Sequence, residues 1–126
     1  MKAFGATLLL NATGMQPDGL RTYVFKSTDG GMTWTVQTQV PSAGHANLVL
    51  IASTRWAYFG NDGSGQETID AGKSWHAFSC DYSDAAGVAS TFVFADANVG
   101  YGTVRGVVRR TINGGVHWEL IQNSWP

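Results

Sequence analysis

Four aspartates fall in glycine-rich stretches of the sequence, where two carboxylates could act as a catalytic pair: Asp18, Asp62, Asp81 and Asp84. A glycosidase needs two carboxyl groups about 5–10 Å apart, one protonated and one ionised. An aspartate in a glycine-rich segment also forms turns, because its carboxylate accepts hydrogen bonds from nearby backbone N–H groups. We therefore expect turn formation from these residues, with glycoside hydrolysis as the alternative.

Two further side chains in these stretches are suited to binding. The ring of Tyr82 can stack on a sugar or on a partner's side chain, and Arg105 offers several donors in a fixed fork. With Asp62 and Asp84 they form our set of candidate ligand-binding residues. We assign no catalytic residue.

Neither metal ions nor cofactors are expected. His45, His76 and His117 do not recur at equivalent positions, and Cys80 is the only cysteine, which rules out an internal disulfide and a cysteine-based metal site. The sequence shows no glycine-rich phosphate loop.

The composition argues against two classes of partner. The net charge is −1 with only eight lysines and arginines, which does not suit a nucleic-acid or anionic membrane surface. No apolar run reaches the ~20 residues needed to cross a bilayer. Residues 1–10 loosely resemble a short signal peptide, but a strand accounts for the same residues, so we expect a cytoplasmic protein. Secretion is the alternative.

The elements that position these residues are set by an eight-residue phrase that occurs three times, at residues 27–34, 68–75 and 111–118. The tryptophans that close it are 41 and 43 residues apart, a spacing typical of repeat architectures.

Each phrase predicts a turn between two strands. An Asp or Asn accepts bonds from the backbone of the turn, a glycine adopts positive φ, and the tryptophan anchors the next strand. The residues assigned to these structural turns are Asp29, Gly31, Trp34, Asp70, Gly72, Trp75, Asn113, Gly115 and Trp118.

The pattern S/T-x-D-x-G-x-T/S-W resembles the Asp-box, or BNR repeat, of sialidase-like β-propellers; Asn113 and His117 depart from it in the third copy. The resemblance implies a propeller fold in which the box residues hold turns and carry no chemistry. The sialidase Arg-Ile-Pro segment is missing, so we do not expect sialidase activity. Residues 92–102 are similar to a repeat of photosystem II assembly-factor-like propellers, which implies a binding platform rather than an enzyme.

The segments around the boxes predict an all-β chain, 1–126, of three four-stranded antiparallel blades: 1–40, 45–80 and 88–122. The first blade lacks a convincing inner strand and is expected to be incomplete. Tyr58 and Tyr101 each precede a box-opening threonine by ten residues, which predicts equal spacing in the second and third blades. Val36 and Val40 are expected on one face of a strand with period two.

Three blades cannot close a ring, since propellers typically have four to eight. We therefore expect a homodimer that closes a six-bladed propeller; a fragment of a longer propeller and a stack capped in another way are the alternatives. The expected function is non-catalytic binding of a protein or carbohydrate on the loop face, which the resemblance places opposite the Asp-box turns.

Overall fold

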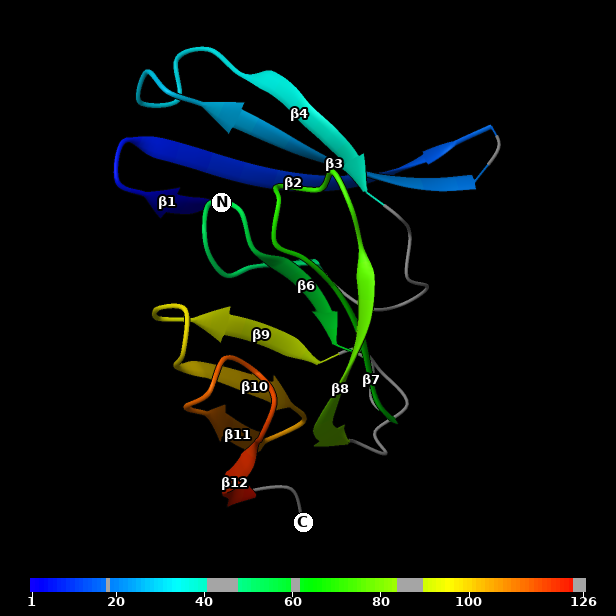
Figure 1. Ribbon diagram of the computed structural model, residues 1–126, viewed down its shortest axis with the longest axis vertical. Coiled ribbons are helices and arrows are strands. Elements are labelled where there is room, and N and C mark those ends of the chain that lie inside the picture. The colour runs from blue at the N-terminus through cyan, green and yellow to red at the C-terminus, as the bar shows by residue number, and fades with distance from the viewer. Residues whose placement is uncertain (18, 41–47, 60–61, 84–89, 124–126) are drawn as a thin grey trace.

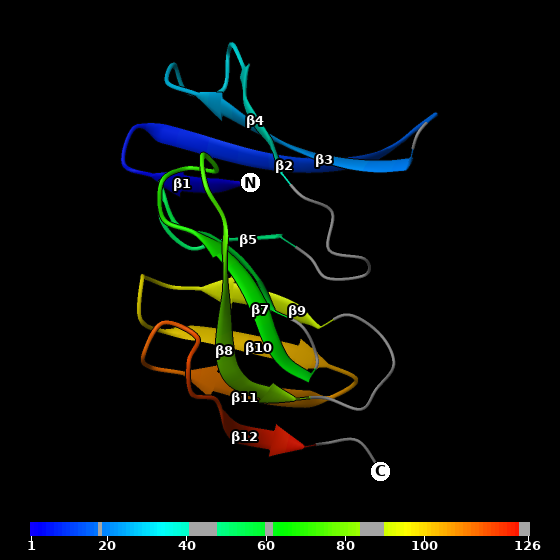
Figure 2. The ribbon, with the colours of Figure 1, turned by 45° about the vertical axis from the view of Figure 1, so that its right-hand side comes forward.

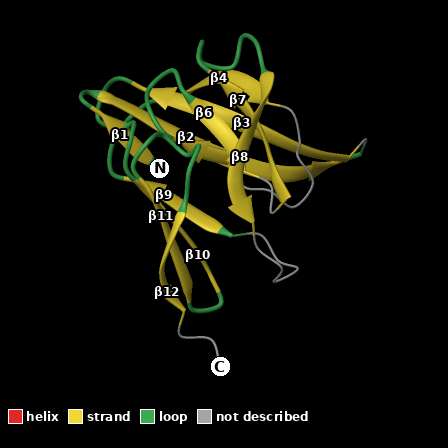
Figure 3. Ribbon diagram, turned by 60° about the horizontal axis from the view of Figure 1, so that its bottom comes forward, coloured by secondary structure: helices red, strands yellow, loops and turns green. Residues whose placement is uncertain are grey.

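The computed structural model describes residues 1–17, 19–40, 48–59, 62–83 and 90–123. In this part of the chain, all regular elements are strands, arranged as three antiparallel four-stranded sheets (Figures 1 and 3). The predicted all-β fold of three four-stranded sheets is thus confirmed. We call the sheets blades 1, 2 and 3 in chain order. The described residues contain no helix long and apolar enough to cross a membrane.

Blade 1 is complete, which corrects the expectation of a missing inner strand. It consists of β1 (Lys2–Phe4), β2 (Thr7–Gln16), β3 (Gly19–Ser27) and β4 (Thr35–Val40), paired in that order. The inner strand β1 has only three residues and pairs with β2 across a tight turn at Gly5, where φ is 62°. A strand this short cannot display a hydrophobic period, so the sequence did not reveal it.

Blades 2 and 3 repeat the same order. Blade 2 contains β5 (Leu48–Leu50), β6 (Trp56–Phe59), β7 (Asp62–Thr68) and β8 (His76–Ser83). Blade 3 contains β9 (Thr91–Phe94), β10 (Gly100–Val104), β11 (Val107–Thr111) and β12 (Glu119–Asn123). In every blade the Asp-box turn joins the third strand to the fourth.

The blades stack face to face, with blade 1 at the top and blade 3 at the bottom of Figure 1. Their first strands, β1, β5 and β9, follow one another through the middle of the molecule (Figure 2). The Asp-box turns lie at one end of the strands. The turns after β2 and β10 lie at the opposite end, which we call the loop end (Figure 2).

Two apolar clusters fill the spaces between blades. Val24 and Trp56, both fully buried, belong to the cluster between blades 1 and 2. Phe59, Phe94 and Trp118 belong to the cluster between blades 2 and 3. Removing these side chains from water is the main stabilising contribution of each interface. Because every blade is covered only by its neighbours, the stability of this fold depends on contacts between successive repeats.

Candidate functional site

The first Asp-box turn is held by bonds between residues two and four positions apart. The hydroxyl of Ser27 donates to Asp29 Oδ1 at 2.8 Å and accepts from the N–H of Gly31 at 2.9 Å. The backbone N–H of Thr33 donates to Asp29 Oδ1 at 2.9 Å. All these partners lie within the turn, so the carboxylate is used to fix the backbone, as predicted.

The second turn repeats this network. Thr68 Oγ1 donates to Asp70 Oδ1 at 2.8 Å and accepts from Gly72 N–H at 2.9 Å, while Ser74 N–H donates to Asp70 at 2.9 Å. Thr68 is completely buried. The two boxes therefore use different hydroxyl residues for the same contacts.

The third turn keeps the backbone bonds with an amide in place of the carboxylate. The oxygen Oδ1 of Asn113 accepts from the Thr111 hydroxyl at 3.0 Å and from His117 N–H at 2.9 Å. The ring Nδ1 of His117 bonds instead to the carboxylate of Asp81, whose Oδ1 also accepts from Trp118 N–H at 2.6 Å. Burial opposes ionisation of Asp81, but these hydrogen bonds outweigh it and lower the pKa of its carboxyl group.

A second polar contact fixes the third turn to blade 2. Arg55 Nη2 donates to the carbonyl oxygen of Gly114 at 2.6 Å, and Nη1 donates to that of Ala97 at 3.3 Å. Glu67 holds the guanidinium from the other side, with its Oε2 at 2.9 Å from Nη2. We call the contacts of Arg55 and Asp81 with blade 3 the clamp.

The free energy of unfolding should decrease in acid because of the carboxyl groups of Asp29 and Asp70 in the first two boxes. The hydroxyl of Thr33 contributes most to lowering the Asp29 pKa from 3.8 to about 2, and that of Ser74 does the same for Asp70. Since the folded pKa lies below the unfolded one, their contribution is complete above pH 4 and is lost as the pH falls towards 2. We expect the urea midpoint to decrease across this window.

In a Thr33→Val/Ser74→Ala double variant, the pKa values should rise towards 3.8 and the urea midpoint should vary less between pH 4 and 2. A variant that retained the full decrease would show that other carboxyl groups cause it. The third box has an amide in place of the carboxylate, so its own residues provide no such dependence, whereas Asp81, which bonds to this turn and has a lowered pKa, adds to it.

The prediction that Tyr82 contacts a ligand is wrong. Residues 81–83 continue strand β8 instead of forming a loop, and this turns the Tyr82 side chain into the space between blades 2 and 3. It is completely buried, its ring centroid lies 5.2 Å from that of Trp118, and its hydroxyl donates to Ser90 Oγ at 2.6 Å. Tyr82 is a core residue.

The other predicted ligand-binding residues are not brought together in the described structure. Arg105 is exposed at the loop end, where it forms with Gly106 a two-residue turn with φ of 47° and 79°. Asp62 begins β7, but its side chain lies outside the described residues, as does the whole of Asp84. Asp81, also considered for catalysis, belongs to the clamp.

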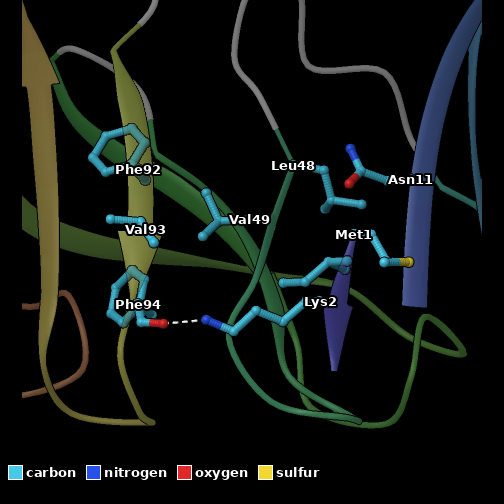
Figure 4. Close-up of a pocket in the computed structure, with 9 residues that line it drawn as sticks. Met1, Lys2, Asn11, Leu48, Val49, Phe92, Val93 and Phe94 are labelled. Atoms are coloured by element: carbon cyan, nitrogen blue, oxygen red, sulfur yellow. Dashed lines mark hydrogen bonds between the residues drawn. The ribbon is translucent and has the colours of Figure 1, made fainter. Parts of the chain in front are cut away.

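A hollow of about 190 Å³ lies between the first strands of the three blades (Figure 4). The ammonium group of Lys2, from β1, reaches across it and donates to the carbonyl oxygen of Phe94 in β9. Phe92, Leu48 and Asn11 surround its other end, which is the loop end (Figure 4). The residues that line it are Met1, Lys2, Asn11, Leu48, Val49, Leu50, Phe92, Val93 and Phe94.

Sequence reasoning did not select the residues of this hollow. The apolar runs of β5 and β9 indicated inner strands, but Lys2 was hidden in a strand too short to recognise. In addition, no group of three His, Cys, Asp or Glu residues that could hold a metal ion occurs among the described residues.

Comparison with known proteins supports the repeat. Residues 25–36, which include the first turn, match the BNR/Asp-box repeat family. The second and third turns have the same backbone bonds, so this chain carries the Asp-box turn in each of its blades. No curated protein matches the chain.

Among solved structures, the chain is similar to "YCF48 bound to D1 peptide", with 15% sequence identity and a TM-score of 0.49. The match covers 94% of this chain and 45% of that one, so the chain spans less than half the length of this structural relative.

Proposed function

We propose that this chain is a non-catalytic binding module of the Asp-box propeller type, and that its ligand is a polypeptide segment that enters the hollow from the loop end. The observation that carries the proposal is the chemistry of the lining. Seven of its nine residues are apolar, and Lys2 and Asn11 supply one ammonium and one amide group. Such a surface suits an apolar side chain of a peptide ligand, while the backbone of that peptide forms hydrogen bonds at the rim of the hollow.

The size of the hollow favours a polypeptide over a sugar. Sites for whole small molecules measure about 300–1,000 Å³, whereas this hollow measures about 190 Å³. One large side chain of a partner fits such a volume, while the rest of the partner lies outside. A carbohydrate remains the alternative class of ligand.

The strands around the hollow offer a second means of recognition. β1, β5 and β9 are each the edge strand of their own sheet. Extended peptides bind to such edges through main-chain hydrogen bonds, and pockets beside the edge select their side chains. The bond from Lys2 already takes up the carbonyl of Phe94, so we expect the peptide to lie nearer the loop end, with Arg105 as a peripheral contact.

We propose in addition that the binding form is a homodimer with six blades. This is supported by the large apolar side chains exposed on the outer sides of blades 1 and 3, such as Val36, which is 59% exposed, and Tyr101, which is 36% exposed. Pairing two copies would cover them.

The peptide proposal can be tested with a random heptapeptide phage library on the immobilised full chain. Enriched peptides are synthesised with a fluorescent label, and their Kd is measured by anisotropy. We expect an aromatic or large aliphatic residue in the enriched set. In Asn11→Asp, which places a carboxylate at the hollow without changing its shape, we expect the Kd to increase at least tenfold.

The matched control is Asn123→Asp, the same change in the outermost strand β12. It should leave the Kd unchanged. Equal binding by both variants would place the peptide site elsewhere. If no peptide is enriched but a glycan array gives a signal, the ligand is a carbohydrate. Hydrolysis of chromogenic glycosides would instead establish an enzyme.

A further inference from the structure

One side of each sheet carries the box tryptophan, and in two blades the preceding blade covers that side. In blade 2, a Cβ added to the box glycine Gly72 would lie 2.7 Å from Cγ2 of Thr38, which belongs to blade 1. In blade 3, a Cβ on Gly115 would lie 2.8 Å from the ring of Phe59, which belongs to blade 2. The backbone of each of these turns is therefore in close contact with the blade before it.

The same side of blade 1 lacks such a cover in the described structure. A Cβ on Gly31 would meet only Leu8 at 3.6 Å and Trp34 at 3.7 Å, both from its own blade. Phe25 of β3 is paired with Leu10 of β2 and with Val36 of β4. Residues paired directly across strands point to the same face of a sheet, so all three lie on this face. We call it the open face of blade 1: Leu8, Leu10, Tyr23, Phe25, Trp34 and Val36.

The box tryptophans differ in what they pack against. Trp118 is 6% exposed beneath blade 2, and Trp75 packs against the cluster shared with blade 1. Trp34 is half-buried, as Trp75 is, and its indole N–H donates to Gly31 O at 2.9 Å, as that of Trp118 does to Gly115 O at 2.8 Å. The geometry of the box is thus the same, and only the cover differs.

Blade 3 has an exposed face at the other end of the stack, on the side away from its box tryptophan. Tyr101, 36% exposed, pairs with Val93 and Arg110 on the side away from blade 2. Arg110 forms an ion pair across the strands with Glu119 at 3.3 Å. We call this the outer face of blade 3.

The outer face of blade 3 has a counterpart inside the molecule. In blade 2, the side that covers blade 3 carries a polar contact across the corresponding third and fourth strands, with Glu67 Oε1 3.2 Å from His76 Nε2. Ala57, the neighbour of Glu67 in β6, lies on that side, in the cluster with Trp118. The outer face of blade 3 is therefore the kind of face that covers a following blade.

We infer that the open face of blade 1 binds the outer face of blade 3 of a second copy, and that two such contacts close a six-bladed ring around a two-fold axis. The open face of blade 1 is of the same kind as the faces that blades 2 and 3 turn towards the preceding blade. The outer face of blade 3 is of the same kind as the faces that cover a following blade, so the new contact would repeat the interfaces between blades 1 and 2 and between blades 2 and 3. A contact between unlike faces closes only if the rotation allows it, and six blades lie within the four to eight found in propellers. This inference rests on the proposed homodimer and adds which faces meet.

Two exposed positions allow a test in the full chain. Val36→Asp places a charge on the open face of blade 1, and Tyr101→Asp places one on the outer face of blade 3. By light scattering, we expect the unmodified chain at about twice its 13.5 kDa and each variant alone as a monomer. An equal mixture of the two variants should return to the dimer mass, because it retains one unmodified pair of faces.

The mixture should dissociate at a concentration at least tenfold higher than the unmodified dimer, because it has one contact instead of two. Ile69→Asp, a change at an equally exposed residue of the second box, should remain dimeric. A monomeric unmodified chain would overturn the homodimer itself, whereas peptide binding at the hollow would stand on its own test.

Other outcomes would overturn only the arrangement. If Tyr101→Asp stays dimeric while Val36→Asp does not, like faces meet. If the mixture stays monomeric, the two faces are not partners. Thermal melting of each variant separates these outcomes from misfolding, because both residues are exposed and the melting temperature of the monomer should change little.

Discussion

Trp118→Ala should destabilise the monomer by on the order of 3–5 kcal/mol, the cost of removing a large ring from a packed core. The side chain is 6% exposed, and its ring centroid lies 5.2 Å from that of Tyr82 and 5.5 Å from that of Phe92. Its indole N–H also bonds to Gly115, so the variant loses both packing and a hydrogen bond. Urea unfolding followed by far-UV circular dichroism measures the change.

Trp34→Ala is the matched control, because it removes the same residue from the first box. Both variants are made in a Tyr101→Asp background, which keeps the open face of blade 1 uncovered. The half-buried Trp34 should contribute less than half as much to stability as Trp118. Equal losses would mean that the tryptophan stabilises its own turn and not the interface with the preceding blade.

Gly115→Ala should destabilise by about 2–4 kcal/mol, through two effects that add. The residue has φ of 100°, a conformation that alanine adopts only with strain. Its new Cβ would also lie 2.8 Å from the ring of Phe59, which is buried and cannot move away easily.

Gly31→Ala separates these effects, because Gly31 has a similar φ of 92° but its new Cβ would make only ordinary van der Waals contacts, at 3.6 and 3.7 Å. In the same Tyr101→Asp background it should lose about 1 kcal/mol, the strain alone. Urea midpoints for the two variants give the difference. If both lose the same amount, contact between blades 2 and 3 contributes nothing at this turn.

The Asp-box turns were predictable because their bonds are local. Every partner of Asp29 and Asp70 lies within four residues, so the identity of the side chains determines the turn without reference to the rest of the fold. The four-stranded blades followed from these turns and from the apolar runs between them.

The register of the strands was harder to predict from the sequence than the turns. Tyr58 and Tyr101 stand at the same distance from their boxes, yet Tyr58 lies in the cluster with blade 1 and Tyr101 faces away from the other blades. Thr68 pairs with Trp56, whereas Thr111 pairs with Gly100, so the hairpin of blade 2 is one residue longer. A shift of one residue moves a side chain to the other face of a sheet.

A bulge caused a similar error in β4. Val36 and Val40 were expected on one side, but Val36 is 59% exposed and Val40 only 2%. The pairing of β3 with β4 shifts between Val24 and Phe25, which inserts an extra residue and reverses the alternation. Tyr82 was misplaced for a related reason, since β8 continues beyond the expected end of its blade. Bulges and strand ends depend on contacts between strands, which a single sequence does not display.

The clamp has a consequence for the order in which the molecule opens. Both interfaces bury an apolar cluster, but between blades 2 and 3 Arg55 and Asp81 add hydrogen bonds to the backbone of the third turn. In a linear array each repeat is coupled mainly to its neighbours, and the better coupled pair opens last. In the monomeric Tyr101→Asp variant, slow hydrogen exchange should therefore extend continuously from β6 to β10, while β2 and β3 exchange earlier as a separate cooperative unit.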